Sequence, residues 1–115
     1  MTTEERKLLK DILESAQSID EYLEGRRVFT EFKESKIKRR AIERELEIIG
    51  EATNNLLKIN PEIPLTHARL IVNLRNRVIH AYDAVDEIII WKIVVKDIPV
   101  LIEETQTLLL KGYIN

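Results

Sequence analysis

Residues 36–59 read KIKRRAIERELEIIGEATNNLLKI, and this stretch decides the fold class. Its apolar residues recur at intervals of three and four, which is the spacing of an α-helix. Ser35 can cap the start, and the Asn60-Pro61 pair ends the helix because proline disfavours helix in the preceding residue. The apolar positions cover more than one stripe, which predicts packing against neighbours on two sides. They are Ile37, Ala41, Ile42, Ile48, Ile49, Ala52, Leu56 and Ile59.

Toward the N-terminus, the sequence predicts one long helix and one short one. Thr2 or Thr3 can cap the long helix, in which apolar residues again recur at helical spacing. Gly25 follows the last of these apolar positions and can act as a stop signal. The segment Val28–Phe32 is then expected to form one or two helical turns before the central helix begins.

Toward the C-terminus, two more helices are predicted. Thr66 can cap a helix that runs to about Tyr82, and Asp86 can cap the last helix. The sequence therefore predicts an all-α fold, an antiparallel four-helix bundle with a short additional helix. The predicted buried face of the last helix comprises Ile88, Trp91, Val94, Val95, Ile98, Leu101, Ile102, Thr105 and Leu108.

The bulk composition fits a single domain over residues 1–115 and excludes several classes of protein. With 44% hydrophobic residues the chain can bury a core, and its net charge of −2 is not that of a strongly basic nucleic-acid-binding protein. The absence of cysteine excludes a disulfide framework and a thiolate zinc site, and the two histidines leave little for a metal centre. No metal and no cofactor are expected. The charged N-terminus and the short apolar runs indicate a cytoplasmic protein without membrane contact.

Charge is distributed unevenly along the chain. Residues 26–44 contain eight basic and three acidic side chains, a net charge of +5, whereas residues 83–104 carry a net charge of −4. The basic segment can guide a phosphate backbone, which makes Arg39 and Arg40 candidate RNA-binding residues. Charge runs on helices are more often solvated faces, so this pattern alone leaves both interpretations open.

Residues 75–83 read RNRVIHAYD and contain the densest group of chemically useful side chains. Cleaving RNA without a metal requires one proton to leave the 2′-hydroxyl and another to reach the 5′-oxygen, and His80 can perform either transfer near neutral pH. Arg75 can bind phosphate oxygens, Asn76 can orient the histidine, and Arg77 is a further candidate for RNA contact. A lone histidine near a helix end is more often a cap or a surface group, so spacing alone does not establish catalysis.

Helix geometry restricts how this segment can act. Arg75 and His80 are five residues apart, so on an ideal helix they point more than 90° away from each other. The helix can end before His80, or two copies of the chain can share one cleft, and we expect a combination of both. His67 has no polar partner in helical register and is interpreted as a cap or surface group. Tyr82 alone would be interpreted as a packing residue, and Trp91 as part of the core.

The order and spacing of Arg75, Asn76, His80 and Tyr82 resemble the signature of the HEPN superfamily, and specifically of its HepT-type branch. The likeness extends over most of the chain, from about Ile37 to Leu101. The additional segments that resemble this branch are Ile48–Ala52, Pro61–Pro64, Trp91 and Asp97–Pro99.

The resemblance implies a metal-independent endoribonuclease toxin. Such proteins are homodimers that place two Arg/His sets around one cleft, here Arg75 and His80 with Asn76. Their partner is a minimal nucleotidyltransferase antitoxin, which attaches AMP to the motif tyrosine, here Tyr82, within a larger toxin–antitoxin complex. The alternative is a non-catalytic helical module that docks the nucleotidyltransferase.

Overall fold

A computed structural model describes residues 1–73 and 87–114, with side chains as far as Gly112. Among these residues, four helices have defined bounds: α1 Thr3–Tyr22, α2 Phe29–Glu34, α3 Lys36–Ile59 and α5 Glu87–Ile114. A further helical segment spans residues 68–73 and reaches the edge of the described part. The described ranges contain no strand, so the predicted all-α fold is confirmed.

The helix starts follow the capping residues that the sequence offers. At α1, the Thr2 hydroxyl accepts a hydrogen bond from the Glu5 backbone N–H at 3.0 Å, and the Glu5 carboxylate accepts one from the Thr2 N–H at 3.4 Å. At α3, the Ser35 hydroxyl accepts from the Lys38 N–H at 3.2 Å. After α1 the chain turns at Gly25, whose φ of 71° lies in the left-handed region that glycine adopts without strain. These caps and this stop signal match the predictions.

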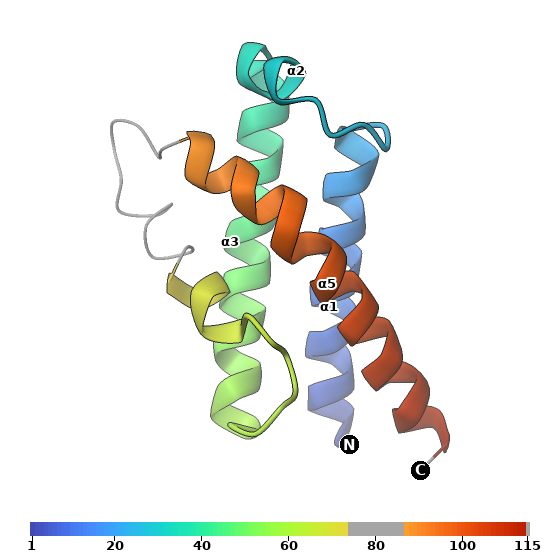
Figure 1. Cartoon of the computed structure of the whole chain (residues 1–115). Helices are drawn as coiled ribbons and strands as arrows, with labels where there is room; N and C mark the ends of the chain where they lie inside the picture. The colour runs from blue at the N-terminus through green and yellow to red at the C-terminus, as the bar shows by residue number, and fades with distance from the viewer. Residues whose placement is uncertain (74–86, 115) are drawn as a thin grey trace.

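Figure 1 shows α1 and α3 side by side and antiparallel, with α5 crossing both of them. The start of α5 lies near the start of α3, where Arg39 Nε is 3.6 Å from Glu87 Oε1. Its far end reaches the start of α1, where Arg6 Nη2 donates to the Gly112 carbonyl at 2.9 Å. The two chain termini therefore lie at the same end of the bundle, while α2 lies at the opposite end (Figure 1).

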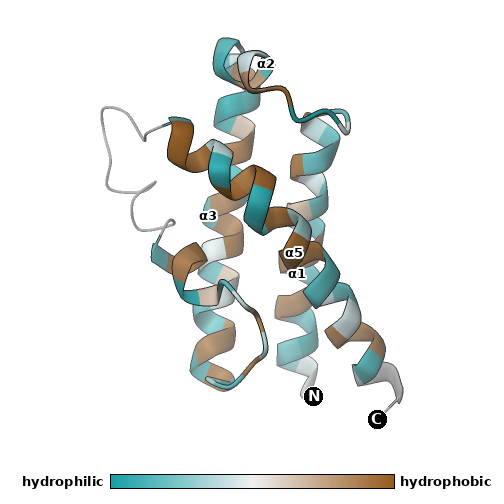
Figure 2. Ribbon diagram, viewed as in Figure 1, coloured by the Kyte–Doolittle hydropathy of each residue, from teal (hydrophilic) through white to brown (hydrophobic). Residues whose placement is uncertain are grey.

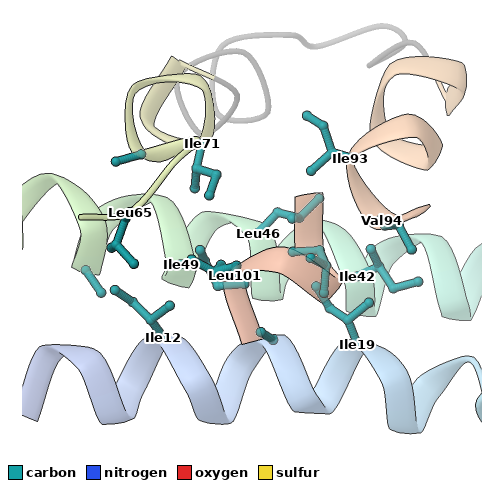
Figure 3. Packing of buried hydrophobic residues seen from close by; sticks show 14 of the residues in the cluster. Ile12, Ile19, Ile42, Leu46, Ile49, Leu65, Ile71, Ile93, Val94 and Leu101 are labelled. Atoms are coloured by element: carbon teal, nitrogen blue, oxygen red, sulfur yellow. The ribbon is translucent and has the colours of Figure 1, made fainter. Parts of the chain in front are cut away.

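One hydrophobic cluster joins α1, α3, α5 and the segment that precedes residue 73. Its labelled members in Figure 3 are Ile12, Ile19, Ile42, Leu46, Ile49, Leu65, Ile71, Ile93, Val94 and Leu101. Near the α2 end, Trp91 stacks on Phe32 with ring centroids 5.2 Å apart and meets the edge of Phe29 at 5.8 Å. Trp91 thus packs against the core, as the sequence predicts.

The predicted buried face of α5 is wrong at two positions. Ile88 and Val95 are 55% and 41% exposed, and the helix packs instead through a face that includes Ile90 and Ile93. The physical reason is the composition of the first half of α5, where Figure 2 shows many hydrophobic residues between a few hydrophilic ones. Apolar spacing selects a buried face only when the opposite face is polar. Ile37 of α3, which was also predicted to pack against a neighbouring element, is 83% exposed.

None of the helices within residues 1–73 and 87–114 is both long enough and apolar enough to cross a membrane.

Candidate functional site

The motif residues Arg75, Asn76, Arg77, His80 and Tyr82 lie outside the described residues, as does the Asp86 cap that the sequence predicts. The structure describes the two flanks of this motif. We call the segment that leads into residue 73 the entry flank and the start of α5 the exit flank. In Figure 3 the helical segment that carries Ile71 and the part of α5 that carries Ile93 both lie above α3, with α1 below it.

The entry flank is fastened to α5 at Thr66. The Thr66 backbone N–H donates to Glu104 Oε1 at 3.1 Å, and its hydroxyl donates to Glu104 Oε2 at 2.5 Å. The sequence predicts that Thr66 caps the following helix, but that helix begins at residue 68 and the hydroxyl donates to α5 instead. One carboxylate therefore holds both a backbone and a side-chain donor of the entry flank.

The neighbouring residue, His67, makes a second contact with α5. His67 Nδ1 lies 3.1 Å from Asp97 Oδ1, and the Asp97 side chain is only 9% exposed. A carboxylate buried to this extent is costly unless a polar partner compensates it, and His67 is that partner. The interpretation of His67 as a cap or surface group, based on the lack of a polar partner in helical register, does not include this contact, because counting along one helix cannot reveal a partner on another.

A pocket of about 240 Å³ opens beside His67. Its apolar walls include Leu57, Ile63 and Leu65, and its polar side chains include His67 and Arg69. We refer to it as the His67 pocket. No sequence pattern indicates it, because its walls come from the end of α3, the following loop and the next helix.

The exit flank is held by Arg39. The Arg39 guanidinium lies 3.6 Å from the Glu87 carboxylate and donates to the Lys33 carbonyl, so it joins α2, α3 and the first residue of α5. Its side chain is largely covered. These protein contacts give Arg39 a structural role at the motif boundary, and its predicted contact with RNA stays a prediction.

Comparison with known proteins identifies the family to which the chain belongs. The Ribonuclease HepT-like family profile matches residues 12–108, a span that includes both flanks and the motif between them. The chain belongs to the HepT-like ribonuclease family.

Several curated proteins are similar to this HepT-like chain over most of their length. A protein of Methanocaldococcus jannaschii that is named as an RNase is 39% identical over 102 residues, which cover 85% of this chain and 90% of the relative. A Thermococcus cleftensis protein named as ribonuclease HepT is 40% identical over 98 residues, covering 81% and 84%. A Caldanaerobacter subterraneus protein named as an RNase is 34% identical over 110 residues, covering 92% and 95%. No solved structure gives a significant match.

The basic segment of this HepT-like chain separates into paired and unpaired cations. Arg26, Arg27 and Arg44 each lie within an ion pair, with N···O distances of 2.6, 2.5 and 3.2 Å. Lys36 and Arg40 are exposed and have no ion pair among the described residues. They are four residues apart on α3 and so share one face of the helix. This pair forms an exposed positive patch on α3, and Lys33 and Lys38 likewise have no ion pair among the described residues.

Two carboxyl groups of α3 are perturbed by burial. Burial raises the pKa of Glu43, and the nearby guanidinium groups of Arg40 and Arg39 only partly offset the effect. Burial also raises the pKa of Glu45, which lines a groove of about 410 Å³ between α1 and α3 together with Glu14 and other polar residues. No sequence pattern indicates this acidic groove, because its side chains come from two helices.

Proposed function

We propose that the chain is a metal-independent endoribonuclease toxin of a toxin–antitoxin pair. The observation that carries this proposal is the motif Arg75-Asn76, three residues, His80, one residue, Tyr82, in a member of the HepT-like ribonuclease family. The names of the relatives, which describe them as ribonucleases, support it further.

The proposed reaction is an intramolecular transesterification, in which the 2′-oxygen of the RNA displaces the 5′-oxygen at the adjacent phosphate. The His80 imidazole takes the proton of a 2′-hydroxyl, and the freed oxygen attacks the adjacent phosphorus. The bond between phosphorus and the 5′-oxygen breaks, and the imidazolium supplies the proton that the leaving oxygen needs. Arg75 stabilises the negative charge of the crowded phosphorane, and Asn76 positions the imidazole. The products are a 2′,3′-cyclic phosphate and a 5′-hydroxyl.

We further propose that the active form is a homodimer in which two motif segments share one cleft. The exposed face of α5 supports this assembly, because Ile88 and Val95 are seven residues apart and lie on one stripe of the helix. The exposed face also carries Lys92 and Lys96, so the two apolar side chains would form the centre of a contact with a charged border. Pairing through this stripe would bring the starts of two α5 helices together, next to the residues that follow each motif.

The proposed antitoxin is a minimal nucleotidyltransferase that transfers AMP from ATP to the phenolic oxygen of Tyr82, with release of pyrophosphate. Tyr82 follows His80 by two residues. A phosphate attached there places negative charge where the RNA phosphate must bind, so it competes by repulsion as well as by bulk.

The direct test is to incubate the purified chain with single-stranded RNA in excess EDTA and to identify the ends of the products. We expect cleavage, with 2′,3′-cyclic phosphate and 5′-hydroxyl ends. Cleavage that requires added magnesium, or that leaves 5′-phosphate ends, would contradict metal-free transfer. A chain that binds the nucleotidyltransferase but cuts no RNA would favour the docking module instead.

The unpaired cations of α3 lead to a separate prediction about RNA binding. Replacing Lys36 and Arg40 together by alanine should weaken the binding of single-stranded RNA to a similar extent for all sequences. The slope of log K against log salt should become shallower by about 0.7 for each phosphate that the variant no longer neutralises. Fluorescence anisotropy titrations at several salt concentrations measure both effects.

The matched control is the double variant Arg26→Ala and Arg44→Ala, which removes the same charge from two exposed cations that already lie in ion pairs. Its salt slope should stay close to that of the parent. If both double variants lower the slope equally, net charge rather than the Lys36/Arg40 face governs binding.

A further inference from the structure

The His67 pocket has a fixed aromatic ring at its edge. The Asp97 carboxylate, 3.1 Å from His67 Nδ1, favours a proton on that nitrogen and so holds the ring in one orientation. The contact uses only one edge of the imidazole, and the His67 side chain is still 39% exposed. Because α5 orients the ring before any ligand arrives, little further conformational freedom is lost on binding.

A second planar group, the Arg69 guanidinium, lines the same pocket. Arg69 is exposed and has no ion pair within the part of the chain that the structure describes. Most of the other lining residues have apolar side chains, Leu57, Ile63 and Leu65 among them, but polar atoms make up most of the surface that the pocket exposes. The pocket therefore combines two planar cationic or aromatic groups with polar atoms that can meet the edge of a base.

This combination matches one ligand chemistry, that of a nucleobase. Proteins that bind single-stranded RNA stack unpaired bases on histidine rings and on guanidinium planes. The volume of about 240 Å³ is below the roughly 300–1,000 Å³ of pockets for drug-sized ligands, so it suits a small fragment such as one base. In the sequence, the pocket residues end at Leu70, five positions before Arg75, where the motif begins.

We propose that the His67 pocket is a base-binding subsite that holds one nucleobase of the RNA substrate, with His67 and Arg69 as its stacking groups. Asp97 is the positioning residue that orients the His67 ring. This inference rests on the proposed ribonuclease function and adds to it the place where one base is held.

The same contact between His67 and Asp97 also fastens the entry flank to α5, so the experiment must separate fastening from stacking. His67→Asn does so, because the asparagine amide can still reach Asp97 whereas the imidazole ring is gone. A fastening role predicts that His67→Asn behaves like the parent. A stacking role predicts that it behaves like His67→Ala.

The experiment measures binding in the His80→Ala background, so that RNA is bound without being cut. Two fluorescent probes of equal length and charge are titrated, an oligoadenylate and an abasic ribose-phosphate chain. The parent should bind the oligoadenylate more tightly. His67→Ala and His67→Asn should each weaken oligoadenylate binding by about 5- to 150-fold more than they weaken abasic binding. Arg69→Ala also removes a positive charge and so should weaken the binding of both probes, but it should weaken oligoadenylate binding more. Addition of the oligoadenylate should also shift the His67 ring resonances in NMR spectra.

The outcomes separate this subsite from the proposed function. The subsite is wrong if the parent binds both probes equally, if His67→Asn keeps the parent preference, or if the His67 resonances do not move. If the base preference depends on His67 but the wild-type chain cuts no RNA, the subsite stands and the ribonuclease proposal fails. Arg69 is exposed, so Arg69→Ala keeps the test decisive even if His67→Ala proves unfolded.

Discussion

His80→Ala is expected to cut single-stranded RNA about 100- to 10,000-fold more slowly than the wild-type chain, the usual loss when a general acid–base group is removed. Alanine cannot accept the 2′-hydroxyl proton, and no other histidine belongs to the motif. The rate is measured under single-turnover conditions, with the chain in saturating excess over the RNA, which isolates the chemical step from binding and product release. Far-UV circular dichroism should show unchanged helical content.

The control for this variant is Lys7→Ala, which removes an exposed cation of α1 whose ion pair with Asp11 lies on the surface. Its cleavage rate should stay within a factor of about two, because an exposed pair of this kind contributes little to stability. A His80→Ala chain that degrades RNA at the parent rate would remove His80 from the mechanism.

Tyr82→Phe is expected to abolish AMP transfer completely. When the wild-type chain is incubated with its cognate nucleotidyltransferase, ATP and magnesium, its mass should increase by one or more AMP groups. Phenylalanine lacks the phenolic oxygen that forms the new bond to phosphorus, so the variant should keep its original mass. Because that oxygen takes no part in the proposed cleavage, the variant should still cut RNA and should resist silencing.

Tyr22→Phe provides the matched control, since Tyr22 is an exposed tyrosine of α1 outside the motif. It should accept AMP to the same extent as the wild type. Intact-mass spectrometry distinguishes the two variants directly. AMP on Tyr82→Phe but not on Tyr22→Phe would place the modification on α1 and overturn the proposed switch.

Much of the fold was predictable from the sequence because its decisive signals are local. The Ser35 cap, the apolar spacing of α3 and the proline after Asn60 act within a few residues, and α3 has the predicted bounds Lys36–Ile59. The buried face of α5 was not predictable to the same degree. Ile88 and Val95 are as apolar as the residues that pack, so the choice of face depends on how α5 crosses α1 and α3.

In the candidate site, too, features that depend on local sequence were predictable and contacts between distant segments were not. The motif residues could be identified because their order and spacing resemble the HEPN signature, and their roles stay predictions. The contacts that hold its entry flank could not be found in this way, because Thr66 and His67 lie in the turn before residue 68 whereas their partners, Glu104 and Asp97, lie on α5, distant in sequence. A crossing angle decides those pairs, and helical periodicity carries no information about it.

One helix, α5, holds both boundaries of the motif: Glu87 contacts Arg39 at the exit, and Asp97 and Glu104 contact the entry. Pro99 lies inside α5, between the Glu87 contact and the Glu104 contact, and interrupts the backbone hydrogen bonding of the helix. A bend at this point changes the distance that residues 74–86 must bridge between the two boundaries. A second subunit seated on Ile88 and Val95, in the half of α5 before Pro99, would bias that bend, so weakening the proposed subunit interface is expected to change the rate of RNA cleavage as well as the mass of the assembly.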